Sequence, residues 1–329
     1  MSGPPVVAID LGGTKIRSIV VDADGQIHGE DRRETLAERG EAVVIDRMVA
    51  SVHEAIAASG IPFSSLVAIG VTAPGPVDFE RGILYQPPNL PGWDAVPLGR
   101  MLQERIGLPA FLENDANAAA FGEWRYGAGQ GARHMLYLTI STGVGGGLIL
   151  DGRLYRGADG SAGELGHIAV DDAGPLHTCG QHGCLEVMAS GTAIGRMARE
   201  AVEAGRSKAL ADLAATVHEL SAIEVDKAAD AGDPVALEIL GTASHYLGVG
   251  FANYLNIFNP EVIVIGGGVT HIGRLLLDPA IELGRSRAFR LPAQTVEFRR
   301  AALEGRAEVL GVGELAREGA GRSGETVGR

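Results

Sequence analysis

Basic residues, cysteine and long apolar runs are all scarce in this sequence, and each scarcity excludes a class of protein. The net charge of −13 argues against a nucleic-acid-binding groove, which needs a basic face. No uninterrupted apolar run approaches the roughly 20 residues that a membrane helix requires. Residues 1–5 lead directly into a short apolar strand, without the pattern of a signal peptide. We therefore expect a cytoplasmic protein that binds neither nucleic acid nor membrane.

The composition is that of a soluble globular protein, with 46% hydrophobic and 21% charged residues. A chain of 329 residues is long enough for two domains with substantial cores. Short apolar runs alternate with segments of helical periodicity, which predicts an α/β architecture with two lobes and a hinge near 115–120. The Gly- and Ser-rich tail from Gly319 is expected to be disordered. Strands are predicted near 6–9, 16–21, 26–33, 66–71, 135–140, 148–150, 261–265 and 295–299, and helices near 41–58, 97–106, 116–126, 234–257, 274–288 and 307–318.

Three glycine-rich loops, at 12–15, 142–147 and 266–268, each follow an apolar strand. Successive backbone N–H groups at such a turn form an anion-binding nest, and glycine lets a phosphate approach closely. Neither the P-loop pattern nor a G-x-G-x-x-G that opens a helix is present, so these two nucleotide sites are not supported. Each loop alone could be a plain turn, but two strand–turn–strand units from two lobes could hold a polyphosphate between them.

Two carboxylates stand beside these loops. Asp10 precedes the first glycine loop, where it could hold magnesium through water or simply cap the turn. Asp115 ends a predicted strand and opens a helix, and on local grounds the role of helix N-cap is favoured for it.

The segment 163–186 holds both cysteines of the chain. Thiolate and imidazole groups at this close spacing suit a tetrahedral structural zinc, with His167, His177, Cys179 and Cys184 as candidate ligands. Buried hydrophobic cysteines and hydrogen-bonded core histidines are the alternatives, and His182 could compete as a ligand. A disulfide is disfavoured because nothing suggests export. A metal here would fix the flanking Glu164 and Glu186, which suit a hydroxyl-rich ligand.

Six motifs occur in an order that resembles the ROK family of repressors and sugar kinases, and in particular its bacterial glucokinases. They are 10–17 (DLGGTKIR), 88–93 (PNLPGW), 113–117 (ENDAN), 141–147 (STGVGGG), 163–167 (GELGH) and 179–186 (CGQHGCLE). The resemblance implies a two-domain, actin-like ATPase fold of the ribonuclease H-like, hexokinase type. It also implies a small α/β domain of 1–117 plus about 303–329, and a large α/β domain of 118–302 with a zinc loop at 163–186.

The function implied by the resemblance is that of an ATP- and Mg²⁺-dependent hexose kinase of carbohydrate metabolism and glycolysis, most closely a glucokinase. Kinases for mannose, fructose or an N-acetylhexosamine remain alternatives, as does a sugar-binding sensor without turnover. ROK repressors carry a helix-turn-helix segment before the first glycine loop, whereas nine residues precede Asp10 here, so we expect no regulator. The family also implies a homo-oligomer, either a dimer or a tetramer.

The resemblance assigns roles to individual residues, with Asp115 as the catalytic base. His167 would both bind sugar and hold zinc, and His177 stands where the family usually has a cysteine. The expected sugar ligands are Asn89, Asn114, Asp115, Glu164, His167 and Glu186. The expected ATP-binding residues are Asp10, Gly12, Gly13, Thr14, Lys15, Thr142, Gly143, Gly145 and Gly146 for the phosphates and Gly267 and Gly268 for the adenosine, and the zinc ligands are His167, His177, Cys179 and Cys184.

Overall fold

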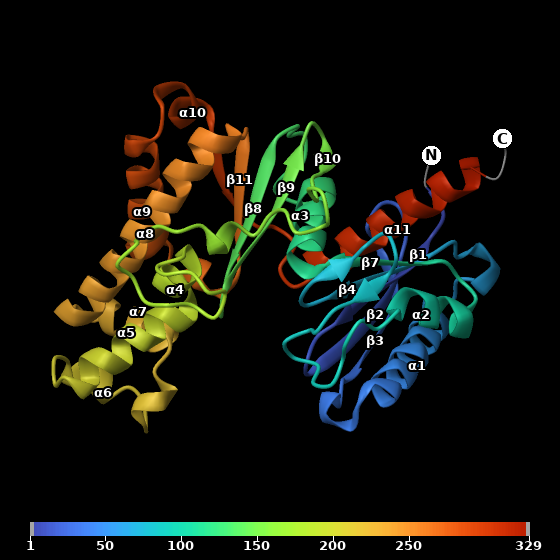
Figure 1. Ribbon diagram of the computed structural model, residues 1–329, viewed down its shortest axis with the longest axis horizontal. Helices are drawn as coiled ribbons and strands as arrows, with labels where there is room; N and C mark the ends of the chain where they lie inside the picture. The colour runs from blue at the N-terminus through green and yellow to red at the C-terminus, as the bar shows by residue number, and fades with distance from the viewer. Residues whose placement is uncertain (1–2, 327–329) are drawn as a thin grey trace.

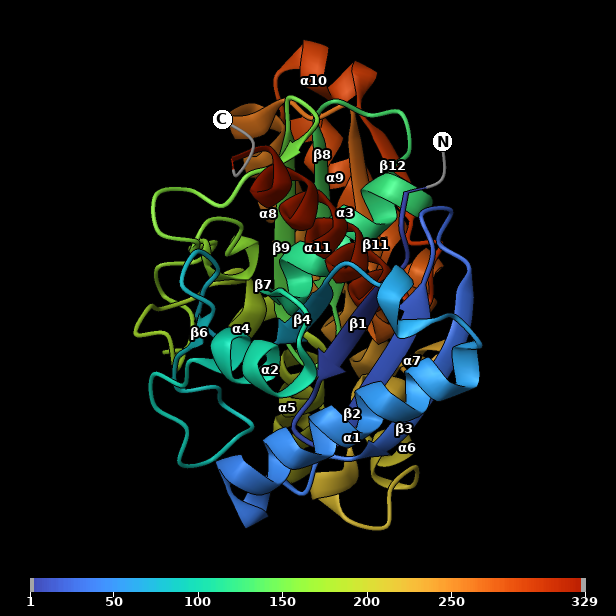
Figure 2. The same cartoon turned by 90° about the vertical axis from the view of Figure 1, so that its right-hand side faces the viewer.

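The computed structural model describes residues 3–326 and shows two lobes, each built on a five-stranded sheet (Figures 1 and 2). The first sheet has the order β3-β2-β1-β4-β7, in which β1, β2 and β3 are antiparallel neighbours and β4 and β7 run parallel to β1. Its strands are β1 (Val6–Leu11), β2 (Lys15–Val21), β3 (Ile27–Glu34), β4 (Ile69–Ala73) and β7 (Ala110–Asn114).

The second sheet repeats this plan, with the order β10-β9-β8-β11-β12. An antiparallel hairpin of β8 and β9 is followed by β11 and β12, which run parallel to β8. Its strands are β8 (Met135–Ile140), β9 (Val144–Leu150), β10 (Arg153–Leu154), β11 (Val262–Gly266) and β12 (Glu297–Arg300).

Two helices, α3 (Asp115–Tyr126) and α11 (Ala307–Thr326), form a layer that both sheets share. Successive residues of a strand point to opposite faces, so Val6 and Ala8 of β1 pack on this layer while Val7 and Ile9 face away from it. Tyr137 of β8 packs on the same layer from the other lobe. The two lobes are therefore joined by a common core.

The helices of this shared layer cross at glycine. A Cβ on Gly311 would lie 1.8 Å from the carbonyl oxygen of Ala118, and one on Gly122 would lie 2.1 Å from that of Ala307. The two backbones are thus in direct contact, which no larger residue at either glycine allows without a backbone shift.

Further helices cover the outer faces of the two sheets. On the first lobe these are α1 (Glu41–Ser59) and α2 (Leu98–Ile106), with a small hairpin of β5 (Val77–Asp78) and β6 (Ile83–Leu84) beside them. On the second they are α4 (Leu185–Ala189), α5 (Gly191–Glu203), α6 (Lys208–Ala211), α7 (Ala222–Asp230), α8 (Pro234–Phe258), α9 (Gly273–Arg287) and α10 (Arg290–Thr295).

Helix α8 is long and apolar enough, by length and composition, to cross a membrane. However, 61% of its most apolar window is buried inside the protein, where Leu247, Phe251 and Tyr254 belong to the core of the second lobe. Its apolar character is therefore accounted for by internal packing.

Each predicted strand and helix corresponds to an observed element, with two corrections, whereas the short elements β5, β6, β10, α4 and α10 have no predicted counterpart. The chain after Gly319 is not irregular, because α11 continues to Thr326; residues 327–329 of the predicted tail and 1–2 at the other end lie outside the described residues. The glycine run after Thr142 is mostly strand, since β9 already begins at Val144. Glycine serves close packing here, because helix α3 lies so near β9 that a Cβ on Gly147 would stand 2.5 Å from the Cβ of Ala120. The division into domains at 117 and 302 stays a prediction.

Candidate active site

The turn between β7 and α3 places Asn114 and Asp115 at the cleft between the lobes. Asn114 is the N-cap of α3, since its Oδ1 accepts the backbone N–H groups of Ala116 at 2.9 Å and Asn117 at 3.2 Å. The local prediction that Asp115 caps this helix is therefore wrong, because the preceding residue fills that position. The Asp115 carboxylate accepts the Ala116 N–H at 2.7 Å and is exposed to the cleft.

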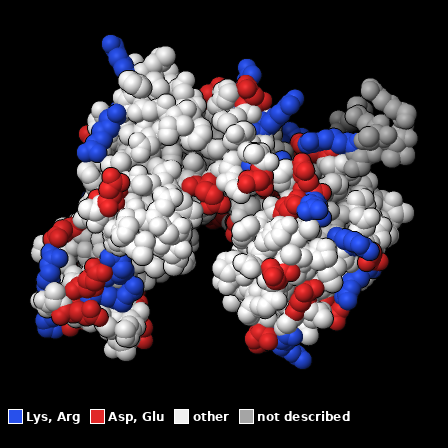
Figure 3. Space-filling view, viewed as in Figure 1, with Lys and Arg blue, Asp and Glu red and all other residues white. Residues whose placement is uncertain are grey.

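Several carboxylates converge on this cleft and oppose each other's ionisation. The space-filling view shows an open cleft with acidic side chains near the place where the lobes join (Figure 3). Although water reaches Asp115, the protein on both sides of the cleft reduces its hydration, and this burial, with the charges of Asp10 and Glu164, raises its pKa. Burial likewise raises the pKa of Asp10, whose Oδ1 accepts the Thr72 hydroxyl at 2.9 Å, and that of Glu308.

A cavity of about 280 Å³ gathers most of the predicted sugar ligands. Asn114 and Asp115 line one side, and Glu164, His167 and Glu186 line another, together with the turn 141–146. Sequence reasoning missed a neighbouring cavity of about 380 Å³, which shares Asn114, Glu164 and Gly146 with the first. Its other lining residues are Gly75, Pro76, Val77, Asp78, Tyr85, Asn117, Asp159, Gly160, Ser161 and Ala162.

Asn89 is absent from the lining of both cavities. It lies on an exposed loop that packs over the first glycine turn, where a Cβ on Gly13 would stand 2.5 Å from that of Asn89. That turn is closed by the bond from Gly12 N–H to the Lys15 carbonyl at 2.9 Å. Thr14 and Lys15 are exposed at its tip.

The second and third glycine turns meet at two further cavities. One, of about 450 Å³, is lined by Thr139, Ser141, Gly267, Gly268 and Glu308 among others. The other, of about 580 Å³, joins Thr142 and Gly268 to residues that the sequence did not single out: Gly191, Thr192, Gly195, Arg199, Leu220, Ser221, Ala222, Ile223, Asp226, Val269, His271 and Ile272. No local pattern marks these residues, because they come from separate helices and become neighbours only in the fold.

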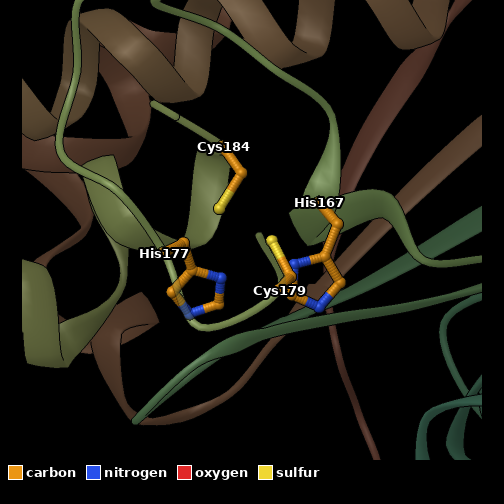
Figure 4. A group of neighbouring side chains, drawn as sticks. All are labelled: His167, His177, Cys179 and Cys184. Atoms are coloured by element: carbon orange, nitrogen blue, oxygen red, sulfur yellow. The ribbon is translucent and has the colours of Figure 1, made fainter. Parts of the chain in front are cut away.

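The candidate zinc ligands His167, His177, Cys179 and Cys184 form one group, whose ligand atoms all lie within 4.8 Å of one another (Figure 4). The Nδ1 atoms of both histidines are buried without a hydrogen-bond partner, as expected of atoms that face a metal. His182 lies outside the group, because its Nδ1 is within 2.9 Å of the Gly174 carbonyl oxygen. Two imidazoles and two thiol groups fit a tetrahedral zinc.

Glu186 connects this group to the second glycine turn. Its Oε1 lies 3.1 Å from Nε2 of His177, and its Oε2 accepts the backbone N–H of Val144 at 2.6 Å. A Cβ on Gly143 would stand 2.3 Å from the same Oε2, so glycine is needed for this approach. The contact with His177 leaves the Nδ1 of that ring for a metal, an arrangement typical of metal-binding histidines.

Comparison with known proteins agrees with this geometry. The family model described as "ROK family" matches residues 6–319. A glucokinase of Thermotoga maritima is 40% identical over 84% of this chain and 86% of its own. A ROK family glucokinase from Streptomyces griseus, solved in complex with glucose and AMPPNP, superposes with a TM-score of 0.78 at 36% identity, over 95% of this chain and 99% of its own.

Regulators of transcription share the same architecture. A ROK family transcriptional regulator, a homolog of the E. coli MLC protein, superposes with a TM-score of 0.85 at 28% identity, over 97% of this chain and 78% of its own.

The predicted two-domain, actin-like ATPase fold of the hexokinase type is confirmed by these matches. On the match of the family model and the identity with the glucokinase, this chain belongs to the ROK family.

Proposed function

We propose that this protein is an ATP-dependent glucokinase, which transfers the γ-phosphoryl group of ATP to the 6-hydroxyl of glucose. The observation that carries the proposal is the cavity in which Asp115 lies beside Asn114, Glu164, His167 and the glycine turn 141–146. A carboxylate of raised pKa next to backbone donors for phosphate is what phosphoryl transfer to a sugar hydroxyl needs. The glucokinase relatives support glucose as the substrate.

Asp115 acts as the general base in this proposal. Its carboxylate accepts the proton of the 6-hydroxyl while the oxygen attacks the γ-phosphorus and the bond to the leaving ADP breaks. Burial and the neighbouring charges of Asp10 and Glu164 make the carboxylate more basic than a free aspartate, which favours proton acceptance.

The sugar hydroxyls are recognised by groups of opposite hydrogen-bonding character. Asn114 uses its Oδ1 to cap α3, so its amide N–H groups are the part that can donate to the sugar. Glu164 and Glu186 accept hydroxyl protons, and Nε2 of His167, 3.8 Å from the Glu164 carboxylate, adds a further polar contact. Asn89 would join them from the loop over Gly13. A site of this kind rejects an analogue that lacks a hydroxyl, because its own groups are then left unpaired.

The ATP phosphates would contact both glycine turns, through Asp10, Gly12, Gly13, Thr14, Lys15, Thr142, Gly143, Gly145 and Gly146, and the adenosine would lie near Gly267 and Gly268. The charge of Asp10 raises the pKa values of Asp115 and Glu308, and that of Asp115 also raises the pKa of Glu308, which fits a divalent cation close to these carboxylates. The chemistry that Mg²⁺ would supply when held here is neutralisation of the phosphate charge. Asp10, fixed by Thr72, would hold that cation through water.

Zinc would be held by His167, His177, Cys179 and Cys184. Its role would be structural, since all four of its ligands would come from the protein. Held in this way, His167 and, through His177, Glu186 would be fixed in the orientation that the sugar requires.

We place the protein in the cytoplasm, where it feeds glucose into glycolysis. Its partners are the hexose and ATP, and it binds neither nucleic acid nor membrane. We also propose that it is a homo-oligomer of two or four chains with a small domain of 1–117 plus 303–329 and a large domain of 118–302. Light scattering of the purified protein measures the oligomeric state directly.

A coupled assay of ADP release over a panel of hexoses tests the function. Glucose should give the highest kcat/KM, above mannose, fructose and N-acetylglucosamine, with ATP preferred over polyphosphate as donor. The variant Asp115→Asn is the matched negative control. Flat traces for every sugar would refute the kinase and favour a sensor, and a higher kcat/KM for another hexose would refute the assignment to glucose.

A further inference from the structure

A buried ion pair joins the two sides of the sugar-binding region, and no role above uses it. Glu113 is next to last in β7 of the first sheet, and Arg156 follows β10 at the edge of the second. Nε of Arg156 donates to Oε2 of Glu113 at 2.6 Å. The Glu113 side chain is only 5% exposed and that of Arg156 22%, so the pair is largely shielded from water.

Glu113 uses its other oxygen to shape the turn at which the catalytic base lies. Its Oε1 accepts the backbone N–H of Asn114 and the side-chain amide of Asn117, both at 3.1 Å. One carboxylate thus fixes two residues of the segment that surrounds Asp115. A carboxylate this deeply buried needs a paired charge, which Arg156 provides.

Arg156 also organises the segment that leads to Glu164. Its carbonyl oxygen accepts the N–H of Ala162 at 3.1 Å, which closes the loop just before the Glu164 side chain. Its guanidinium lies 4.8 Å from the centre of the Phe79 ring, a cation–π contact with the first lobe. The same loop approaches that lobe at Gly160, where a Cβ would stand 3.2 Å from the Val77 carbonyl oxygen.

We propose that Arg156 is a positioning residue for the hexose. By bonding to Glu113 on one side and closing the loop before Glu164 on the other, it sets the spacing between Asn114 and Asp115 and the carboxylate of Glu164. This inference rests on the proposed function, because it concerns the same sugar site. Arg156 itself does not contact the substrate. The cavities proposed for the nucleotide, at Thr142 and Gly268, should not depend on Arg156.

Steady-state kinetics of Arg156→Met test the inference. The KM for glucose should rise at least about tenfold and kcat should fall, since misplacing reacting groups by a fraction of an ångström is costly. The KM for ATP should stay within about twofold of wild type. Arg156→Lys keeps the charge but lacks the planar guanidinium, so its KM for glucose should lie between those of the wild type and Arg156→Met. The control Arg153→Met, at an exposed arginine of β10, should behave as wild type.

A second variant separates positioning from stability. Arg156→Met leaves the buried Glu113 charge unpaired and lowers Tm, whereas Glu113→Gln with Arg156→Met removes both charges and should recover part of that loss. The KM for glucose should nevertheless stay raised in the double variant. If it returns to the wild-type value together with Tm, or if the KM for ATP rises in parallel with that for glucose, the inference is overturned. A wild-type protein that phosphorylates no hexose refutes the proposed function and this inference together.

Discussion

Replacement of Asp115 by asparagine should make the protein a worse enzyme and a more stable fold. The change keeps the shape of the side chain and an oxygen that can accept the Ala116 N–H, now bound at 2.7 Å by the carboxylate. It removes the proposed general base, so kcat should fall by about 10²–10⁴, equivalent to roughly 3–5 kcal/mol of transition-state stabilisation. Calorimetry should still detect glucose binding, since the other proposed sugar ligands remain.

The effect on stability follows from the sign of the pKa shift. The folded protein raises the pKa of Asp115 above its unfolded value, so the ionised form is disfavoured in the fold. The contribution of this group to stability is full below the unfolded pKa of about 3.9 and is lost as the pH rises through the folded pKa. An asparagine side chain does not ionise, so Asp115→Asn should raise Tm at pH 7.5, and the gain should vanish near pH 4.

Thermal melting at pH 7.5 and near pH 4 tests the expected gain in Tm, and the ADP-release assay tests the expected loss of kcat. Asp278→Asn, at an exposed position of α9, is the matched control and should leave both readings unchanged. If the role of Asp115 were only local and structural, asparagine would replace it almost equally well, and both Tm and kcat would stay near wild type at either pH. An unchanged Tm at pH 7.5 with turnover preserved would therefore refute the reasoning.

Further predictions concern the candidate zinc ligands, the neighbouring Glu186 and the crossing of α3 and α11. Protein purified without chelator should contain one zinc per chain by elemental analysis, and its removal should abolish glucose binding; zinc-free protein that binds glucose would contradict this. Glu186→Gln should weaken zinc by about 10–100-fold in chelator competition, because it alters the partner of His177, whereas His182→Ala should not. Gly311→Ala should lower Tm by several degrees, since its Cβ would overlap the Ala118 carbonyl; an unchanged melting curve would disprove that contact.

The cluster of His167, His177, Cys179 and Cys184 could be predicted from the sequence because all four residues lie within one short segment. Cys179 and Cys184 are brought to His177 by local turns, so spacing alone carries the information. The pair of Glu113 and Arg156 could not be predicted, because 43 residues separate its members and nothing in either neighbourhood marks the contact.

Composition misleads where tertiary packing decides the conformation. The residues after Gly319 are small, polar or charged, a pattern typical of disorder, yet they extend α11. Gly319 lies against the Phe111 ring of β7, where a Cβ would stand 2.5 Å from a ring carbon, so its small size serves packing rather than flexibility. Asn114 and Asp115 show the same limit at shorter range, since both are good N-cap residues and only the backbone shows which one fills the position.

The layer shared by α3 and α11 has a consequence for synthesis on the ribosome. One face of the first sheet, with Val6, Ala8 and Ile19, is covered by helix α11, which begins at Ala307. At about 5–20 residues per second, the strands that end at Asn114 wait roughly 10–40 s for that helix to be made. During that interval an apolar surface of the nascent chain stays uncovered and open to chaperones. The first sheet to be translated is therefore among the last to be completed.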